Sequence, residues 1–106
     1  MIIKISSLVT SLQKSVREIK KIIVPHSSLR VYLFGSVLHS PNPNDVDLLI
    51  QYNKSIIPKD ILKLKNALKR YYKMYHNIDL HISLLTDDEL RETKFLGRIR
   101  YIEIKL

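Results

Sequence analysis

The sequence predicts an α+β domain in which a mixed β-sheet of three to four strands is flanked by helices. Two observations support this fold class. Segments with helical spacing of apolar residues alternate with short apolar runs that suit strands, and such alternation is typical of layered domains. The length of 106 residues, with 45% hydrophobic and 26% charged residues, fits one globular unit. We therefore expect a single domain over residues 1–106.

Hydrophobic spacing places two long helices and one shorter one. Over residues 7–23 the apolar residues recur every three or four positions, and Pro25 ends this helix. Pro58 suits the first turn of a second helix, in which leucines and tyrosines again share one side. Thr86 and Glu89 form a capping box that begins a third helix, which we expect to end at Gly97.

Four segments are strand candidates. Residues 29–34, 45–52 and 78–85 are apolar and rich in strand-forming residues. Residues 101–106 alternate in polarity and suit either a fourth, edge strand or a continued helix, of which we favour the strand. The prolines and asparagines of residues 40–44 mark a loop. Only about ten residues separate the first two strands, too few for a usual parallel crossover, so we expect them to be antiparallel or a mixed-sheet edge.

Composition limits the chemistry. The chain has no cysteine, which excludes disulfides, zinc–thiolate sites and a thiol nucleophile. Its 18 Lys and Arg against 10 Asp and Glu give a net charge of +8, which favours polyanionic partners such as nucleotides, RNA or an acidic protein surface. No apolar run approaches the ~20 residues that cross a bilayer, and residues 1–5 are too short for a signal peptide. We expect a cytoplasmic protein.

Three aspartates stand out because they lie in apolar strands, where aspartate is disfavoured and a buried, unpaired carboxylate normally becomes neutral or finds a cation. Asp45 and Asp47 are two residues apart, so they point to one face of their strand and are within reach of one ion. Oxygen ligands suit Mg²⁺. Asp79 would complete a cluster able to hold two ions if its strand lies beside theirs; alternatively it is a strand-edge acid that pairs with a lysine.

A glycine and a serine precede these acids and suit phosphate binding. Gly35 allows the backbone to approach a ligand closely, and Ser36 offers a hydroxyl and an amide at what we expect to be the start of a short helix. The chain thus runs from a strand through Gly-Ser and a loop to Asp-x-Asp in the next strand. This order places phosphate donors and metal ligands side by side.

The order of motifs resembles the minimal nucleotidyltransferases of the DNA polymerase beta superfamily. The matching segments are Leu33-Phe34-Gly35-Ser36, then Asp45-Val46-Asp47-Leu48, then Ile78-Asp79-Leu80. The resemblance implies a polymerase beta-like nucleotidyltransferase fold. It also implies that Gly35 and Ser36 bind the triphosphate, that Asp45 and Asp47 hold the catalytic magnesium ions, and that Asp79 is the third carboxylate, as a ligand or as the base.

The chain departs from the family after Gly-Ser. Family members often carry an arginine there, and this chain has Val37-Leu38-His39-Ser40 instead. Either triphosphate binding is weaker than in the family or His39 substitutes for the arginine. His81 lies two residues after Asp79 and should share its face, where a structural role is the alternative to ligand contact.

The resemblance implies transfer of AMP, or another nucleoside monophosphate, from Mg-bound ATP to a protein or RNA acceptor. It further implies an antitoxin of the stand-alone type, whose partner is a HEPN-type ribonuclease toxin. The alternative is a catalytically inactive binding module on the same fold that masks a partner protein or binds RNA through its basic surface.

Overall fold

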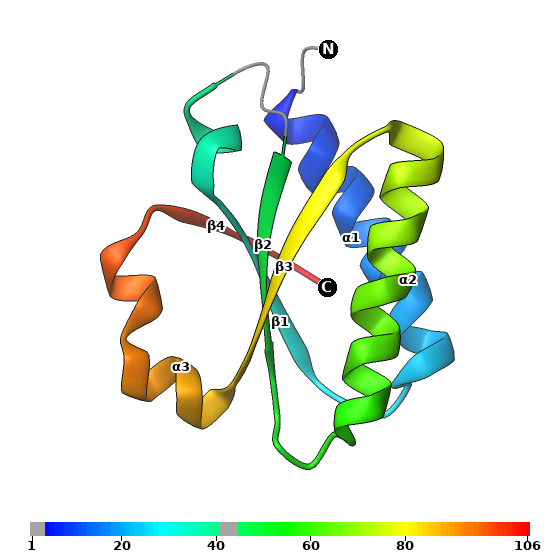
Figure 1. The fold of residues 1–106 in the computed structure, drawn as a ribbon, viewed down its shortest axis with the longest axis vertical. Coiled ribbons are helices and arrows are strands. Elements are labelled where there is room, and N and C mark those ends of the chain that lie inside the picture. Colours follow the sequence, from blue (N-terminus) through cyan, green and yellow to red (C-terminus); the bar gives the residue numbers. More distant parts are fainter. Residues whose placement is uncertain (1–3, 41–44) are drawn as a thin grey trace.

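A four-stranded mixed sheet forms the centre of the computed structural model, which describes residues 4–40 and 45–106 (Figure 1). The strands are β1 (Leu29–Phe34), β2 (Asp45–Tyr52), β3 (Asp79–Thr86) and β4 (Tyr101–Ile104), in the spatial order β3-β2-β1-β4. β1 is antiparallel to β2 and to β4, whereas β2 and β3 are parallel. The α+β fold class, the antiparallel first pair and the fourth edge strand are therefore confirmed.

Two long helices cover one face of the sheet. α1 (Ile5–Ile23) begins two residues earlier than predicted, and α2 (Pro58–His76) begins at the predicted proline. α2 also connects the parallel strands β2 and β3, a connection that such a pair requires. Figure 1 shows α1 and α2 side by side against the sheet. Most of the buried apolar side chains lie between these helices and the sheet, and the fully buried ones include Leu12, Val16, Leu33, Leu48, Ile50, Leu64 and Leu68.

A buried tyrosine ties the two long helices together. The Tyr72 hydroxyl on α2 lies 2.8 Å from Ser11 Oγ and 2.7 Å from Ser15 Oγ on α1. Burial raises the pKa of Tyr72, and the hydrogen bonds to the two serines act in the opposite direction. The helix pair is thus fixed by polar contacts inside an otherwise apolar layer.

The opposite face of the sheet is covered only in part. α3 (Asp87–Thr93) and the 3₁₀ helix η2 (Phe95–Arg98) pack there over a second, smaller cluster centred on Tyr32, Leu49 and Leu90 (Figure 1). The predicted capping box is present, since Thr86 Oγ1 accepts from the Glu89 amide and the Glu89 carboxylate accepts from the Thr86 amide. We call the side of the sheet that carries α3 the open face.

The predicted end of the third helix is wrong. α3 ends at Thr93, where Lys94 adopts a left-handed conformation with φ of 53°, and Gly97 lies inside η2 instead. Lysine is unusual in this backbone region, so the residue type at position 94 does not indicate the end of a helix. The predicted loop falls largely on residues 41–44, outside the described residues. Within the described ranges, no helix is both long and apolar enough to span a bilayer.

Candidate functional site

The two parallel strands bring the three predicted aspartates to one end of the open face. Asp45 and Asp79 are register partners at the first positions of β2 and β3, and Asp47 is paired with His81. The intervening Val46 and Leu80 are buried on the side of α1 and α2. The strand of Asp79 therefore lies beside that of Asp45 and Asp47, as the three-carboxylate interpretation required.

The aspartates are not buried, which corrects one premise of the sequence interpretation. The side chains of Asp45, Asp47 and Asp79 are 46%, 30% and 51% exposed. The residues that cover the open face, α3 and η2, pack around Leu49 and Tyr32 further along the strands. Because water reaches the carboxylates, burial alone does not demand a cation here.

His81 stands between the first two carboxylates. Its Nε2 lies 3.6 Å from Asp45 Oδ1, and its Nδ1 lies 3.8 Å from Asp47 Oδ1. Both carboxylates therefore converge on one ring. These distances are longer than hydrogen bonds, and a protonated imidazole would add charge attraction at both. Sequence reasoning placed His81 on the face of Asp79 but did not link it to Asp45 and Asp47, because that link arises from the parallel register.

Asp79 is held by a lysine. Lys73 Nζ, in the last turn of α2, lies 3.1 Å from Asp79 Oδ1 and 3.4 Å from Oδ2. This ion pair is the contact expected from the alternative interpretation of Asp79, a strand-edge acid paired with a lysine. Over residues 4–40 and 45–106, no group of three or more His, Asp or Glu side chains is arranged to hold a metal ion.

The backbone of Gly35 lies so close to Asp47 that there is no room for a side chain on residue 35. Its φ is +83°, a region that strongly favours glycine. A Cβ built there would overlap Asp47 Oδ2 and would lie 3.0 Å from Asp47 Cγ. The 3₁₀ helix η1 (Gly35–Leu38) then begins, and it leaves Ser36 exposed beside the aspartates' strand. The Gly-Ser motif and Asp-x-Asp are therefore neighbours in space, as the sequence predicted.

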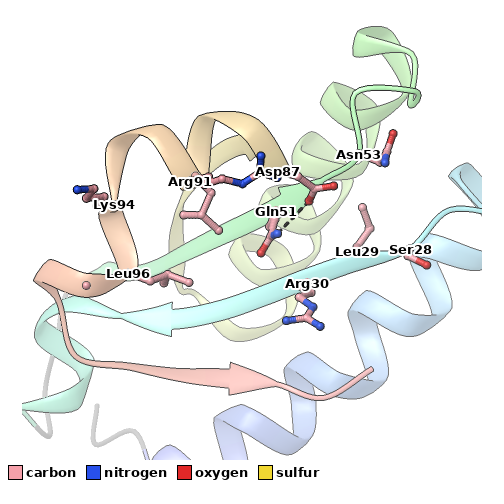
Figure 2. Close-up of a pocket in the computed structure, with 11 residues that line it drawn as sticks. Ser28, Leu29, Arg30, Gln51, Asn53, Asp87, Arg91, Lys94 and Leu96 are labelled. Atoms are coloured by element: carbon pink, nitrogen blue, oxygen red, sulfur yellow. Dashed lines mark hydrogen bonds between the residues drawn. The ribbon is translucent and has the colours of Figure 1, made fainter.

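Cavities lie beside this acidic end and at the other end of the open face. One of about 410 Å³ lies between the start of α1 and η1, and its lining includes Lys4 and His39. Another of about 780 Å³ lies far from the aspartates, between α3, the start of β1 and the end of β2 (Figure 2). Sequence reasoning missed this second cavity because its lining comes from separate segments without a common motif.

Comparison with known proteins supports the fold and assigns a family. No curated protein matches the sequence. The crystal structure of a "putative nucleotidyltransferase" matches with a TM-score of 0.53 and 23% identity, over 87% of this chain and 96% of that one. At this identity the likeness shows the nucleotidyltransferase-like fold alone. The model of a "Family of unknown function (DUF6932)" matches residues 6–102, nearly the whole sequence. The chain therefore belongs to this family, DUF6932.

Proposed function

We propose that the protein is a magnesium-dependent nucleotidyltransferase that transfers AMP from ATP to a protein or RNA acceptor. The observation that carries the proposal is the contact of Gly35 with Asp47, which places the Gly-Ser motif directly against the Asp-x-Asp pair. This contact supports a site in which Gly35 and Ser36 would bind phosphate beside the carboxylates of Asp45 and Asp47, in a nucleotidyltransferase-like fold.

The donor set fits a magnesium ion that also binds substrate. Mg²⁺ usually takes one or two protein carboxylates and completes its shell with water and substrate phosphates. Asp45 and Asp47 supply two carboxylates, and their approach to the same imidazole shows that they converge. Bound magnesium would neutralise the charge of the triphosphate and of the leaving pyrophosphate.

The chain's own groups would then position the substrates. An acceptor hydroxyl oxygen attacks the α-phosphorus of ATP, and the bond from that phosphorus to the pyrophosphate oxygen breaks. Gly35 lets the triphosphate approach the backbone, and the exposed Ser36 hydroxyl donates to a phosphate oxygen. Once its carboxylate leaves Lys73, Asp79 would either accept the proton of the acceptor hydroxyl or become a metal ligand. His39, which lines the 410 Å³ cavity, takes the place of the arginine that minimal nucleotidyltransferases often carry after Gly-Ser.

The assay measures pyrophosphate release with ATP, Mg²⁺ and candidate acceptors. The first acceptors are a HEPN-type ribonuclease toxin, the partner that we propose in a cytoplasmic toxin–antitoxin pair, and RNA. Wild type should release pyrophosphate, and Asp45→Ala with Asp47→Ala should not. Glu18→Ala with Glu92→Ala removes the same charge from exposed sites elsewhere and should retain activity. Equal release by both double variants would refute the enzymatic proposal.

The second candidate is an inactive binding module, favoured by two observations. Asp79 is engaged by Lys73, and the described residues contain no metal-holding group of three. Calorimetry separates the candidates. An enzyme should bind ATP more tightly with Mg²⁺ than with EDTA, whereas an inactive module should show no metal-dependent nucleotide binding and should retain its affinity for a partner protein or RNA.

A further inference from the structure

The 780 Å³ cavity at the far end of the open face has a size typical of small-molecule sites. The start of β1 and the end of β2 form its floor, and α3 with the turn into η2 forms its wall (Figure 2). About four residues of β2 separate Asp47 from Gln51 in this floor, or roughly 13 Å along a strand. The groove is thus distinct from the acidic end. We call it the basic groove.

Positive charge predominates in the lining. Arg30 comes from β1, and Arg91 and Lys94 come from α3 and the residue after it, whereas Asp87 is the single acid among the lining residues (Figure 2). Arg91 has a carboxylate neighbour, since its Nη1 lies 3.5 Å from Asp88 Oδ1. In the described part of the chain, neither Arg30 nor Lys94 forms an ion pair. A hydrogen bond to Tyr32 and attraction by Glu103 and Asp87 act on the Arg30 guanidinium. The lining therefore carries more positive than negative charge, and neither Arg30 nor Lys94 is held in a direct ion pair with a described residue.

The acid of the basic groove is already committed to a polar chain. The Tyr32 hydroxyl donates to Gln51 Oε1 at 2.9 Å. Gln51 Nε2 in turn donates to Asp87 Oδ1 at 2.9 Å (Figure 2). These bonds orient the Gln51 amide and the Asp87 carboxylate, which also attracts the Arg30 guanidinium. The floor is therefore preorganised before any ligand binds.

Two further features suit a ligand that is part apolar and part anionic. Leu29, Leu90 and Leu96 contribute apolar surface to the lining, and Ser28 and Asn53 add polar groups. Gly97 also lines the groove, and a Cβ built on it meets no atom within 4 Å. Lys94 keeps a left-handed backbone, where glycine or asparagine would be easier, and so presents a cation at the rim.

We propose that the basic groove is a second binding site, for a phosphate-bearing ligand of nucleotide size. The cations of the lining would attract the phosphate, and the planar base would lie against the leucines. A free nucleotide and one nucleotide of a single strand present the same chemistry. This site needs neither the aspartates nor a metal ion.

The test is a titration of the full chain in EDTA, followed by ¹H–¹⁵N chemical shifts. The probes are AMP, for a free nucleotide, and a five-nucleotide single-stranded RNA, for a strand. Arg30→Gln with Lys94→Asn removes the two lining cations that form no ion pair, and asparagine tolerates the left-handed conformation. Lys69→Gln with Arg70→Gln removes the same charge from the exposed side of α2. Gly97→Leu adds a large apolar side chain to a lining residue without changing charge.

At least one probe should saturate and shift the amides of Gln51, Leu90 and Gly97. The groove double variant should weaken its binding about tenfold or more, whereas the α2 double variant should change it by less than about threefold. Gly97→Leu should weaken binding as well. Asp45→Asn with Asp47→Asn should leave it unchanged, which separates this site from the proposed active site.

Three results would overturn the proposal. The first is that neither probe saturates at millimolar concentration. The second is that the groove and α2 double variants weaken binding equally, since this would indicate attraction by net charge alone. The third is unchanged affinity in Gly97→Leu, because Gly97 lines the groove and a large side chain on it should interfere with a bound ligand.

Discussion

The two faces of the sheet use the same strands in different ways, and β2 shows this most directly. Its residues Val46, Leu48 and Ile50 point toward α1 and α2 and have no exposed surface. Asp45 and Asp47 alternate with them and are 46% and 30% exposed. One face thus stabilises the domain through apolar burial, and the open face carries charged groups that water and ligands can reach.

This difference teaches that charge changes on the open face should alter chemistry with little loss of stability. Changes on the face covered by α1 and α2 should do the reverse. The variants below test that division, from the largest expected effect to the smallest.

Asp45→Asn with Asp47→Asn tests the open face most severely. Loss of both carboxylates should reduce the proposed nucleotidyl transfer about a hundredfold to a thousandfold, since it removes the two proposed magnesium ligands. The thermal midpoint should stay within a few degrees of wild type or rise, because two exposed like charges are neutralised. Pyrophosphate release and thermal melting measure the two effects. A large loss of stability would contradict the proposed division between the faces.

Gly35→Ala tests the junction between the β1 end and the acidic pair. The added Cβ overlaps Asp47 Oδ2, and the alanine must adopt a positive φ. The free energy of unfolding should therefore fall by about 2–4 kcal/mol. Gly97→Ala is the matched control, since its Cβ meets nothing within 4 Å and its effect should stay within about 0.5 kcal/mol. Urea unfolding compares the two. Equal midpoints would show that Asp47 moves aside freely.

Tyr72→Phe tests the covered face. It removes the hydroxyl that bonds Ser11 and Ser15, and the free energy of unfolding should fall by about 1–2 kcal/mol. Ser15 keeps its bond to the Ser11 carbonyl at 2.9 Å, which limits the loss. Tyr75→Phe changes a side chain that is 67% exposed and serves as the control. Nucleotide affinity should be unchanged in both variants. A changed affinity in Tyr72→Phe would show that the two faces are coupled.

The same tyrosine predicts a loss of stability in alkali. Burial raises the pKa of Tyr72 above its ordinary value of 10.0, so the unfolded chain loses this proton first as pH rises. The contribution is fully present below pH 10 and is lost as pH rises through the folded pKa. Urea midpoints between pH 9 and 11 should therefore fall less steeply in Tyr72→Phe than in wild type. Parallel curves would exclude this contribution.

Lys73→Gln has the smallest expected effect and separates the two roles of Asp79. Its ion pair with Asp79 joins two side chains that are 58% and 51% exposed, and such pairs contribute about 0–1 kcal/mol. Stability should barely change. Transfer activity should be equal or higher if Asp79 acts as a ligand or base, because its carboxylate is freed. A loss of activity would show that Lys73 itself contacts substrate.

Much of the fold follows from local patterns. The helical spacing after Pro58 and the capping box of Thr86 and Glu89 predicted the starts of α2 and α3, because these signals act over a single turn. The short link after Phe34 predicted the antiparallel β1–β2 pair. The end of α3 was not predictable in this way, since Lys94 takes a conformation that its residue type does not indicate.

The sequence by itself determined the two long helices, the first three strands and the motif residues Gly35, Ser36, Asp45 and Asp47, because these depend on residue spacing within short segments. Only the tertiary structure decided that Asp79 aligns with Asp45, that Lys73 and His81 reach the acids, and that the carboxylates stay in water. It also assembled the basic groove from β1, β2 and α3. Strand register and the partial cover of α3 set these contacts, and both arise from packing between segments that are distant along the chain.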